Sequence, residues 1–576
     1  MARIVIETDV LIAGGGPVGL TLALELEHRG VRAVLIERNP TTTRHPKMDV
    51  TNGRSMEHFR RLGIADAMRA QAVPGNHPMS VVWCSRPAEW ELARFHYPGV
   101  DEVRAHIRAT NDGTLPLEPN MRISQVVLEP VLKEYLERHA RSVEVRFGVG
   151  LERFAEDETG VTAVVRETAS GAEHMIRARY LAGCDGASSV TRRGLGIELD
   201  DLAPQDAMSA SGKVRALVGV ARGLFRGERP PDGRIYLVHF RSRNREFFER
   251  FGTLWHLQSP HHGTLIAQND LDTWTLHVPL AGGVDADAID PQRFLFEHLG
   301  REVDCEILVA NAWRPRLALA RSYGRGRVWL AGDSAHQFIP TGGYGMNTGV
   351  GDAVDLGWKL AATLAGWGGP GLLPSYEAER RPVGFRNRAA SARHLAIRTE
   401  IASAYTPSIH EDSPRGAETR RTLGSRIAAL GNLENEALGV EIGYRYDESP
   451  IVCHEAGDAP PWDMARYHPC TWPGVRIPSV FLADGSALYD RLGAGFTLLR
   501  FADVNVARLV EAAAGRGLPV TVLDVRDSAV ARLYERALVL VRPDQHVAWR
   551  GMQEPDDAAA VVDRIRGAGR AVAPAP

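Results

Sequence analysis

Residues 9–37, DVLIAGGGPVGLTLALELEHRGVRAVLIE, decide the fold expected at the start of the chain. The apolar run before the glycines predicts a buried parallel strand, and Gly14, Gly16 and Gly19 form a GxGxxG pattern that leads into a helix. In such a pattern the first glycine permits a tight turn, the second lets a pyrophosphate approach the backbone, and the third lets the helix pack closely on the strand. Glu37 ends the second predicted strand, where a carboxylate can accept hydrogen bonds from a ribose. The stretch therefore predicts a nucleotide-binding βαβ unit, without deciding between NAD and FAD.

Length, charge and cysteine content favour a soluble globular protein. A chain of 576 residues should form about two to four domains, and a formal net charge of -3 gives no reason to expect nucleic acid or an anionic membrane as a partner. The N-terminus lacks the pattern of a secretory signal peptide, and no apolar run has the length of a membrane span, so a cytoplasmic protein is expected. The five cysteines are scattered without CxxC or zinc-site spacing, so we expect reduced thiols and no metal site.

A second strand-turn-helix pattern occurs in residues 327–364, RVWLAGDSAHQFIPTGGYGMNTGVGDAVDLGWKLAATL. Asp333 stands at the end of its predicted strand, and several glycines in the turn let the backbone come close to a ligand. The predicted helix begins at Asn347 or Thr348 and directs its N-terminal amides toward that turn. The two patterns are therefore expected to converge on one ligand.

Three more residues are candidates whose local sequence leaves alternatives open. Asp185 follows a predicted strand in GCDGASSVTRR, where a carboxylate can hold a ribose or ribityl hydroxyl or merely cap the next helix. Arg54 lies near the start of a helix that follows a polar loop, with Asn52 or Thr51 as its N-cap, and it is a cofactor or substrate contact or an ordinary surface arginine. Gln125, near the start of another predicted helix, has an exposed helix position as its alternative.

Taken together, GGGPVG with Glu37, CDGASSVTR at 184–192 and GDSAHQFIPTGGYGMN at 332–347 resemble the motifs of the FAD-dependent aromatic hydroxylases. These are the single-component flavoprotein monooxygenases that include phenol hydroxylase. The resemblance implies that the first motif binds the ADP part of FAD, that Asp185 lies near the flavin and the approach of NADPH, and that Asp333 binds the ribityl chain. Tyr344 departs from the glutamine or phenylalanine expected within GGxG, so packing beside the flavin is expected to differ there.

The resemblance also implies which residues contact FAD, with the backbone of residues 345–347 directed toward the isoalloxazine. The expected cofactor contacts are Gly14, Gly16, Gly19, Glu37, Arg38, Arg54, Gln125, Asp185, Asp333, Pro340, Gly345, Met346 and Asn347.

Asp49 is the expected catalytic residue. In phenol hydroxylase-like members an aspartate, or a histidine in a biphenyl hydroxylase, stands five residues before the arginine that Arg54 matches, and Asp49 occupies that place. Without the family, a solvated loop carboxylate would be the preferred interpretation. A phenol has a pKa of about 10 and is mostly neutral at pH 7, so a base at hydrogen-bond distance would make the ring more phenolate-like and more nucleophilic.

The function implied by the resemblance is hydroxylation of a phenolic ring. NADPH or NADH, as a transient co-substrate, reduces FAD; molecular oxygen then forms a C4a-hydroperoxyflavin that delivers an oxygen atom to a small aromatic substrate. The alternatives are tailoring of a larger polyketide or polyphenolic natural product, a flavoprotein reductase that inserts no oxygen, and a non-catalytic flavin-binding partner protein. A flavin halogenase is disfavoured because no WxWxIP stretch occurs. Substrate identity, regiochemistry and nicotinamide preference are left open.

The predicted fold is α/β, with a discontinuous Rossmann-like FAD-binding domain of the GR2 type interleaved with an antiparallel-sheet substrate domain. The C-terminal residues, 456–576, resemble the thioredoxin-like C-terminal domain of this branch but lack CxxC. We therefore expect them to have a structural or oligomeric role, in a homodimer or higher homo-oligomer. The predicted boundaries are 1–80, 105–200 and 305–400 for the FAD-binding domain, 81–104 and 201–304 for the substrate domain, 401–455 for a helical linker and 456–576 for the C-terminal domain.

Overall fold

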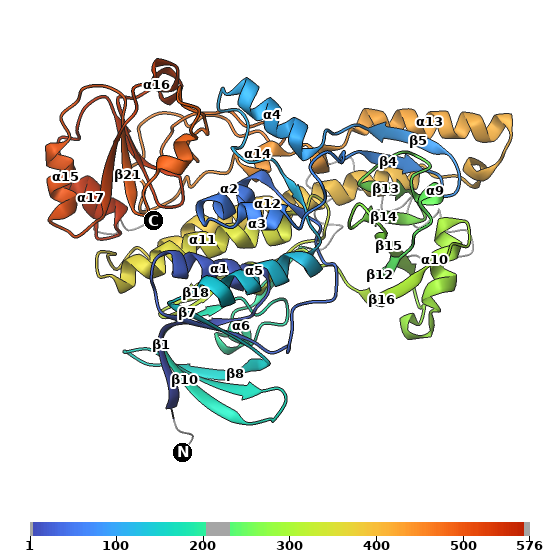
Figure 1. Cartoon of the computed structure of the whole chain (residues 1–576), viewed down its shortest axis with the longest axis horizontal. Helices are drawn as coiled ribbons and strands as arrows, with labels where there is room; N and C mark the ends of the chain where they lie inside the picture. The colour runs from blue at the N-terminus through green and yellow to red at the C-terminus, as the bar shows by residue number, and fades with distance from the viewer. Residues whose placement is uncertain (1–3, 203–230, 570–576) are drawn as a thin grey trace.

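The computed structural model describes residues 4–202 and 231–569. Residues 213–220, KVRALVGV, whose sequence predicts a strand, lie outside these ranges. Its first domain is built on a parallel sheet in which β1 pairs with β2 and β10, β2 pairs with β7, and β10 pairs with β19. Helices α1, α5 and α11 lie together on one side of this sheet (Figure 1). Their bounds are β1 Ile4–Ala13, β2 Ala33–Glu37, β7 Val143–Phe147, β10 Glu173–Gly183, β19 Val328–Leu330, α1 Pro17–His28, α5 Gln125–His139 and α11 Tyr344–Leu364.

The register of the parallel sheet brings four strand ends to one edge. Ala13 at the end of β1 pairs with Ile36 of β2 and Gly183 of β10, and Gly183 in turn pairs with Leu330 of β19. The turns that follow these strands therefore meet at the carboxyl edge of the sheet, which is where open α/β sheets bind ligands. The two strand-turn-helix patterns therefore lie at one edge of the sheet.

Glycines allow close contacts between this sheet and its helices. A Cβ at Gly19 would lie 1.9 Å from the carbonyl oxygen of Gly14, which is the close helix–strand packing predicted for the third glycine. On α11, a Cβ at Gly349 would lie 2.4 Å from Val18, and one at Gly357 would lie 2.4 Å from Glu25. Helix α1 thus packs closely on two sides, against the sheet and against α11, and glycine is needed at both contacts.

The second sheet has the order β16-β12-β15-β14-β13-β4-β5. Its pairings are antiparallel, as predicted, except that β13 pairs with β4 in parallel. The last strand, β16, extends this sheet beyond the boundary predicted at 304. The bounds are β4 Val81–Cys84, β5 Glu91–Phe95, β12 Pro231–Arg241, β13 His256–Ser259, β14 Gly263–Ala267, β15 Thr273–Ala281 and β16 Glu306–Trp313.

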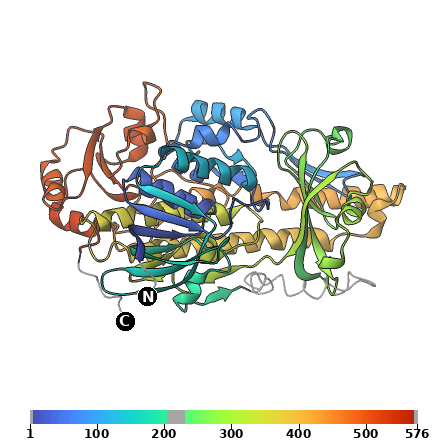
Figure 2. The same cartoon turned by 60° about the horizontal axis from the view of Figure 1, so that its bottom comes forward.

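Long helices connect the two sheets. Helix α12, Ser375–Ser403, packs on α11, and Arg398 near its end donates from Nη1 to Thr264 Oγ1 of β14 at 3.0 Å, so it reaches from the first domain to the second sheet (Figures 1 and 2). Helix α13, Pro414–Leu430, packs on β5. The sequence of 415–439 predicts a charged helical segment, but α13 ends at Leu430 because Gly431, with φ +70°, terminates it. A separate short helix, α14, covers Leu438–Glu441.

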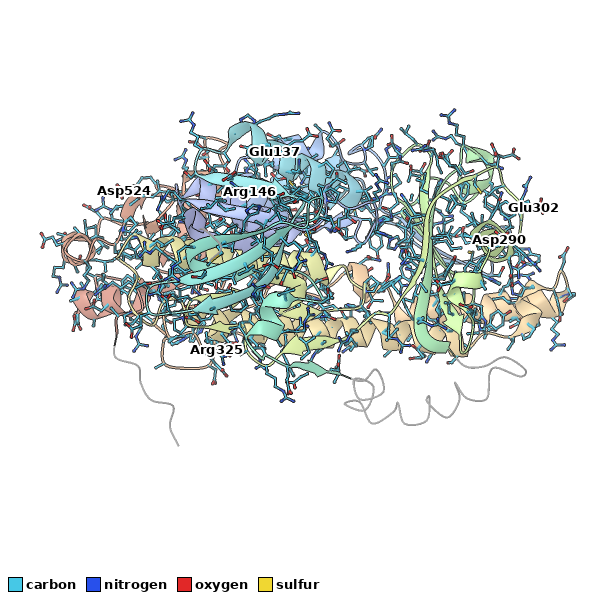
Figure 3. The ribbon with its side chains drawn as sticks, turned by 90° about the horizontal axis from the view of Figure 1, so that it is seen from below. Glu137, Arg146, Asp290, Glu302, Arg325 and Asp524 are labelled. Carbon is cyan, nitrogen blue, oxygen red and sulfur yellow. The ribbon has the colours of Figure 1, made fainter. Side chains whose placement is uncertain are left out.

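The C-terminal part is a compact β-sheet unit with helices. Its sheet order is β22-β21-β23-β24, with β21 parallel to β22 and antiparallel to β23. In Figure 3 Asp524 marks this unit at one end of the molecule, and Asp290 and Glu302 mark the second sheet's domain at the other end. The bounds are β21 Phe496–Arg500, α15 Ala507–Ala514, β22 Val520–Asp524, α16 Ser528–Tyr534, β23 Leu538–Val541, β24 Val547–Gly551 and α17 Ala558–Ile565.

The remaining elements are short or peripheral. They are β3 Val50–Thr51, α2 Gly53–Arg61, α3 Ala65–Arg69, α4 Val100–Thr110, β6 Met121–Arg122, β8 Val149–Glu156, β9 Val161–Glu167, α6 Val190–Gly194, β11 Leu199–Asp201, α9 Arg245–Phe248, α10 Pro291–Leu299, β17 Ala318–Ala320, β18 Gly324–Arg325 and β20 His336–Gln337. Within 4–202 and 231–569, no helix has the length and apolar character needed to cross a membrane. All five cysteines are free thiols.

Candidate active site

A cavity of about 2670 Å³ lies between the carboxyl edge of the parallel sheet and one face of the second sheet. Among the described residues, its lining does not include Gly19, Arg54 or Asn347. The lining does contain the other predicted site residues, namely Gly14, Gly16, Glu37, Arg38, Asp49, Gln125, Asp185, Asp333, Pro340, Gly345 and Met346.

The glycine-rich turn after β1 leaves its backbone open to the cavity. Gly14 has φ +111°, and a Cβ there would lie 2.2 Å from the carbonyl oxygen of Cys184, so only glycine fits. Gly16 is the N-cap of α1, and the nearest atom to a Cβ at this position would be a Glu129 oxygen 4.0 Å away. This geometry matches the first two glycine roles expected for a nucleotide site, a tight turn and a close backbone approach.

Glu37 and Arg38 form the neighbouring part of the wall. The Glu37 carboxylate accepts hydrogen bonds from Gly15 N at 2.8 Å and from Asn39 N at 2.9 Å. Because Glu37 lines the cavity and its carboxylate is held by these amides, the strand end has an acceptor in a fixed position where a ribose would bind. Arg38 is fixed through its backbone, since its carbonyl accepts from Thr168 Oγ1 at 2.6 Å.

Asp333 projects into the cavity from the second strand end. Its side chain is open to the cavity, but the surrounding protein removes it from bulk water, and this raises the pKa of Asp333. The charges of His336 and Lys47 lower the pKa, but by less than desolvation raises it. A carboxyl in such a place can accept and donate hydrogen bonds to a polyol chain.

The turn beyond Asp333 ends earlier than predicted, because α11 begins at Tyr344 and not at Asn347 or Thr348. Its N-cap, Gly343, has φ +65°, and Gly343 N donates to Pro340 O at 3.0 Å. Nothing lies within 4 Å of a Cβ built on Gly345, so there is open space beside the first helical turn. The Tyr344 hydroxyl contacts His394 Nε2 at 2.9 Å, which directs this ring toward α12.

Asn347 does not line the cavity, and its side chain forms hydrogen bonds within the protein instead. Its Oδ1 accepts from Asn52 N at 3.0 Å and from Ser55 Oγ at 2.7 Å, while its Nδ2 donates to Gly343 O at 2.7 Å. Asn52 is itself the N-cap of α2, as predicted, and accepts from Ser55 N. The Asn347 side chain therefore joins the start of α2 to the start of α11.

The structure does not bring the Arg54 side chain to the cavity. Arg54 is 3% exposed, and its guanidinium donates to Glu57 Oε2 at 2.9 Å, to Gln545 Oε1 at 2.6 Å and to the carbonyl oxygen of Asp544 at 2.7 Å. Two of these partners belong to the turn between β23 and β24, so Arg54 links α2 to the C-terminal unit.

Asp185 and Gln125 line the cavity while serving local structure. Asp185 accepts from Thr191 N at 2.9 Å and from Thr191 Oγ1 at 3.0 Å in the first turn of α6, whose N-cap is Ser189. Gln125 donates from Nε2 to Glu129 Oε1 at 2.7 Å, and its backbone N donates to Met48 O at 2.9 Å. The second contact ties the start of α5 to the loop that carries Asp49.

Asp49 lies where the two domains face each other across the cavity. Trp255 Nε1 donates to Asp49 Oδ2 at 2.5 Å, and His256 Nε2 lies 3.6 Å from the same oxygen. Burial of the carboxyl favours its neutral form, but His256, Trp255 and Arg122 outweigh this and hold the pKa of Asp49 below its ordinary value. The Asp49 side chain keeps 16% exposure and lines the cavity, so it is an ionised acceptor within reach of a bound molecule.

The face of the second sheet contributes residues that the sequence did not single out as site residues. A cross-strand row, all of it lining the cavity, follows the register Trp83, Gln258, Thr264, His277, Leu237 and Asn311. The alternation of TLWHLQS at 253–259 indicated a strand, but the face on which each side chain lies depends on register. That register is set by pairing of β13 with β4, far away in the sequence.

The residues of the nucleotide edge fit FAD as the bound group. They provide a glycine turn that a side chain would block, an acceptor at the end of β2, a carboxyl open to the cavity at Asp333, and open space beside Gly345. The described residues contain no group of three or more histidine, cysteine or acidic side chains arranged to hold a metal ion.

Comparison with known protein families gives two matches. Residues 7–391 match the FAD binding domain family, and residues 470–569 match the aromatic-ring hydroxylase C-terminal family. The first match covers the parallel sheet, the second sheet and most of α12.

Individual proteins are similar over nearly the whole chain. The FAD-dependent monooxygenase apdD of Emericella nidulans is 38% identical over 94% of this chain and 87% of its own length. The phenol 2-monooxygenase of a Pseudomonas species is 31% identical over 98% of this chain and 93% of its own length. The structure of the rebeccamycin biosynthetic enzyme RebC with reduced flavin superposes with a TM-score of 0.84, at 34% identity, over 98% of this chain and 99% of that one. The resemblance found in the motifs is thus confirmed, and the chain belongs to the FAD-dependent aromatic-ring monooxygenases.

Proposed function

We propose that the protein hydroxylates a phenolic ring, using NADPH or NADH as a transient co-substrate and molecular oxygen as the source of the inserted atom. The observation that carries the proposal is the position of Asp49. Its ionised carboxylate lies in the same cavity as the nucleotide edge of the parallel sheet, opposite the face of the second sheet. A phenol bound between the two would have its hydroxyl within reach of an acceptor and its ring within reach of the flavin.

Asp49 acts as the base in this proposal. A carboxylate with a lowered pKa is too weak to ionise a free phenol, whose pKa is about 10. Transfer of an electrophilic oxygen withdraws electron density from the ring, however, and makes the ring hydroxyl much more acidic during the reaction. A weak base that is ionised at neutral pH can then take the proton as it is released.

FAD, when bound, supplies reducing equivalents from the nicotinamide and activates oxygen. The protein residues hold and orient the reactants. Gly14 and Gly16 let the backbone approach the pyrophosphate, Glu37 accepts from a ribose, and Asp333 binds the ribityl chain. The first turn of α11, at Gly345 and Met346, borders the space for the ring system. Arg38, Gln125, Asp185 and Pro340 complete the wall, whereas Gly19, Arg54 and Asn347 support the site from outside it.

The size of the cavity favours a substrate larger than a simple phenol as the second candidate. Pockets for one drug-sized ligand are about 300–1,000 Å³, well below the 2670 Å³ available here for FAD and substrate together. Neighbouring strands lie about 4.8 Å apart, so the row from Gln258 to Asn311, which crosses four strand spacings, extends for about 19 Å. A fused polyphenolic or polyketide ring system would use this face, and a single ring would cover only part of it.

The testing experiment measures NAD(P)H oxidation and oxygen uptake by the FAD-loaded protein across a panel from simple phenols to fused phenolic polyketides, with mass spectrometry of the products. The expected result is addition of one oxygen atom to a phenol, strongly slowed in Asp49→Ala with FAD content unchanged. Substrate-stimulated NAD(P)H oxidation without an oxygenated product from any phenol would favour the reductase alternative. FAD binding without stimulated oxidation would favour a non-catalytic role.

Further parts of the proposal concern organisation. The order β22-β21-β23-β24, with two parallel strands followed by an antiparallel pair, supports a thioredoxin-like C-terminal domain, and its structural or oligomeric role fits the absence of CxxC from the sequence. We keep the predicted domain division, with the second sheet extended to Trp313, and the expected cytoplasmic homodimer or higher oligomer. Light scattering of the purified protein would test the oligomeric state.

A further inference from the structure

Asp49 accepts a hydrogen bond from an uncharged side chain of the other domain. Trp255 precedes β13 of the second sheet, whereas Asp49 lies in the loop before β3 of the FAD-binding domain. Their side chains meet through the 2.5 Å bond from Trp255 Nε1 to Asp49 Oδ2. A carboxylate engaged at one oxygen in this way has its orientation fixed, and its other oxygen remains to meet a substrate hydroxyl.

Both ends of this bond are fixed by backbone contacts. Trp255 N donates to Ser80 O at 2.8 Å, and Trp255 O accepts from Ala267 N at 3.0 Å, so strands on either side hold the tryptophan. The Asp49 carbonyl accepts from Ile123 N at 3.0 Å. Trp255 is 5% exposed and packs in a cluster with Met79 and Val81, which restricts rotation of the indole.

We propose that Trp255 is a positioning residue for the Asp49 base: its indole N–H selects the carboxylate oxygen that faces the substrate and favours the ionised form. This inference rests on the proposed function, because Asp49 acts as a base only if the substrate is a phenol. It also implies that the base is correctly placed only when the second sheet is seated against the FAD-binding domain.

Three titratable or charged groups surround Asp49 and must be separated from the effect of Trp255. His256 of β13 lies 3.6 Å from Asp49 Oδ2, and Arg122 of β6 and His277 of β15 interact with the carboxylate through their charges. The indole N–H carries no charge and does not itself titrate, so its effect on Asp49 should change only when the Asp49 carboxyl is protonated. Loss of this hydrogen bond to the charged carboxylate should raise the pKa of Asp49 by about 1 unit.

The first test observes the hydrogen bond directly. The protein contains eleven tryptophans, and ¹⁵N-labelled indoles give one NMR signal each in the FAD-loaded enzyme. The Trp255 signal, assigned by its absence in Trp255→Phe, should shift as pH is lowered through the ionisation of Asp49, and this shift should be absent in Asp49→Asn. If Trp255→Phe does not fold, the signal displaced by Asp49→Asn serves as the assignment. A signal that neither titrates nor responds to Asp49→Asn would overturn the inference.

The second test uses catalysis. In Trp255→Phe the acid limb of kcat/KM against pH should move upward by about 1 pH unit, while FAD content is retained. The matched control is Trp274→Phe in the same sheet, because Trp274 Nε1 is buried and, in the described part of the chain, has no hydrogen-bond partner. Its acid limb should coincide with that of the wild type. An unshifted limb in Trp255→Phe would contradict the inference.

The two failures can be told apart. If the proposed function is wrong, the wild type yields no oxygenated product from any phenol in the panel. If only the role of Trp255 is wrong, the wild type hydroxylates phenols, Asp49→Ala is slow, and the pH profile of Trp255→Phe coincides with that of the wild type.

Discussion

Replacement of Arg54 by methionine should reduce stability and leave FAD affinity nearly unchanged. Family resemblance indicates that Arg54 contacts the cofactor, whereas the structure directs the guanidinium toward Glu57, Gln545 and the Asp544 carbonyl. Methionine keeps much of the aliphatic volume and removes all three hydrogen bonds. The substitution therefore separates a contact with FAD from a link between α2 and the C-terminal unit.

The magnitude follows from the groups left behind. Glu57 keeps a second cation, because Arg476 donates to it from Nε at 2.9 Å and also from Nη2, so its charge is not left unpaired. The Gln545 side-chain oxygen loses its charged donor in a buried place, and an unsatisfied buried acceptor costs about 1–3 kcal/mol. The Asp544 carbonyl also loses a charged donor but keeps a contact with His546 Nδ1 at 3.1 Å. Together these losses should lower the free energy of unfolding by about 2 kcal/mol.

Urea unfolding measures the effect. Tryptophan and flavin fluorescence are both followed, because a multidomain chain can unfold in separate steps. FAD affinity is measured by titration of the apoprotein. The control is Arg138→Met on α5, where an exposed Arg138–Glu134 pair should contribute no more than about 0.5 kcal/mol. A tenfold or larger loss of FAD affinity in Arg54→Met, with the unfolding transition unchanged, would refute the assignment of Arg54 to the domain link.

Two further variants test the nucleotide turn and a buried acid. Gly14→Ala should lose FAD on desalting, measured by flavin absorbance, because its Cβ would lie 2.2 Å from the Cys184 carbonyl oxygen. The control is Gly30→Ala, which is also at positive φ but has nothing within 4 Å of the added Cβ and should retain FAD. Equal FAD retention in both variants would contradict the argument. Burial raises the pKa of Glu441 from 4.5 to about 7, so the folded state binds more protons than the unfolded state in this range and stability falls as pH rises through it. Glu441→Gln should therefore show a smaller decrease in thermal midpoint from pH 5 to pH 8 than the wild type, and an equal decrease would show that this carboxyl does not control the slope.

The parts of the site that the sequence predicted are those made by local chain geometry. A strand, a glycine turn and a helix in succession place Gly14, Gly16 and Glu37 relative to one another within a short stretch, and the pairing of β1 with β2 follows from the same unit. Asp333 is placed by the same logic at its own strand end. Because neighbouring residues determine these positions, periodicity and turn chemistry were sufficient to predict them.

Tertiary structure decided which way the longer side chains point and which distant residues meet. Arg54 and Asn347 stand next to the predicted site in sequence, but packing directs one toward the C-terminal unit and the other toward the start of α2. Likewise, the contact of Trp255 with Asp49 depends on the register of β13 against β4 and on the seating of one domain against the other. The sequence alone determined the nucleotide-binding strand-turn-helix units, because their contacts are local. The surroundings of Asp49 were decided only by the tertiary structure, because a side chain adopts the direction that burial and hydrogen bonding with distant partners make most favourable.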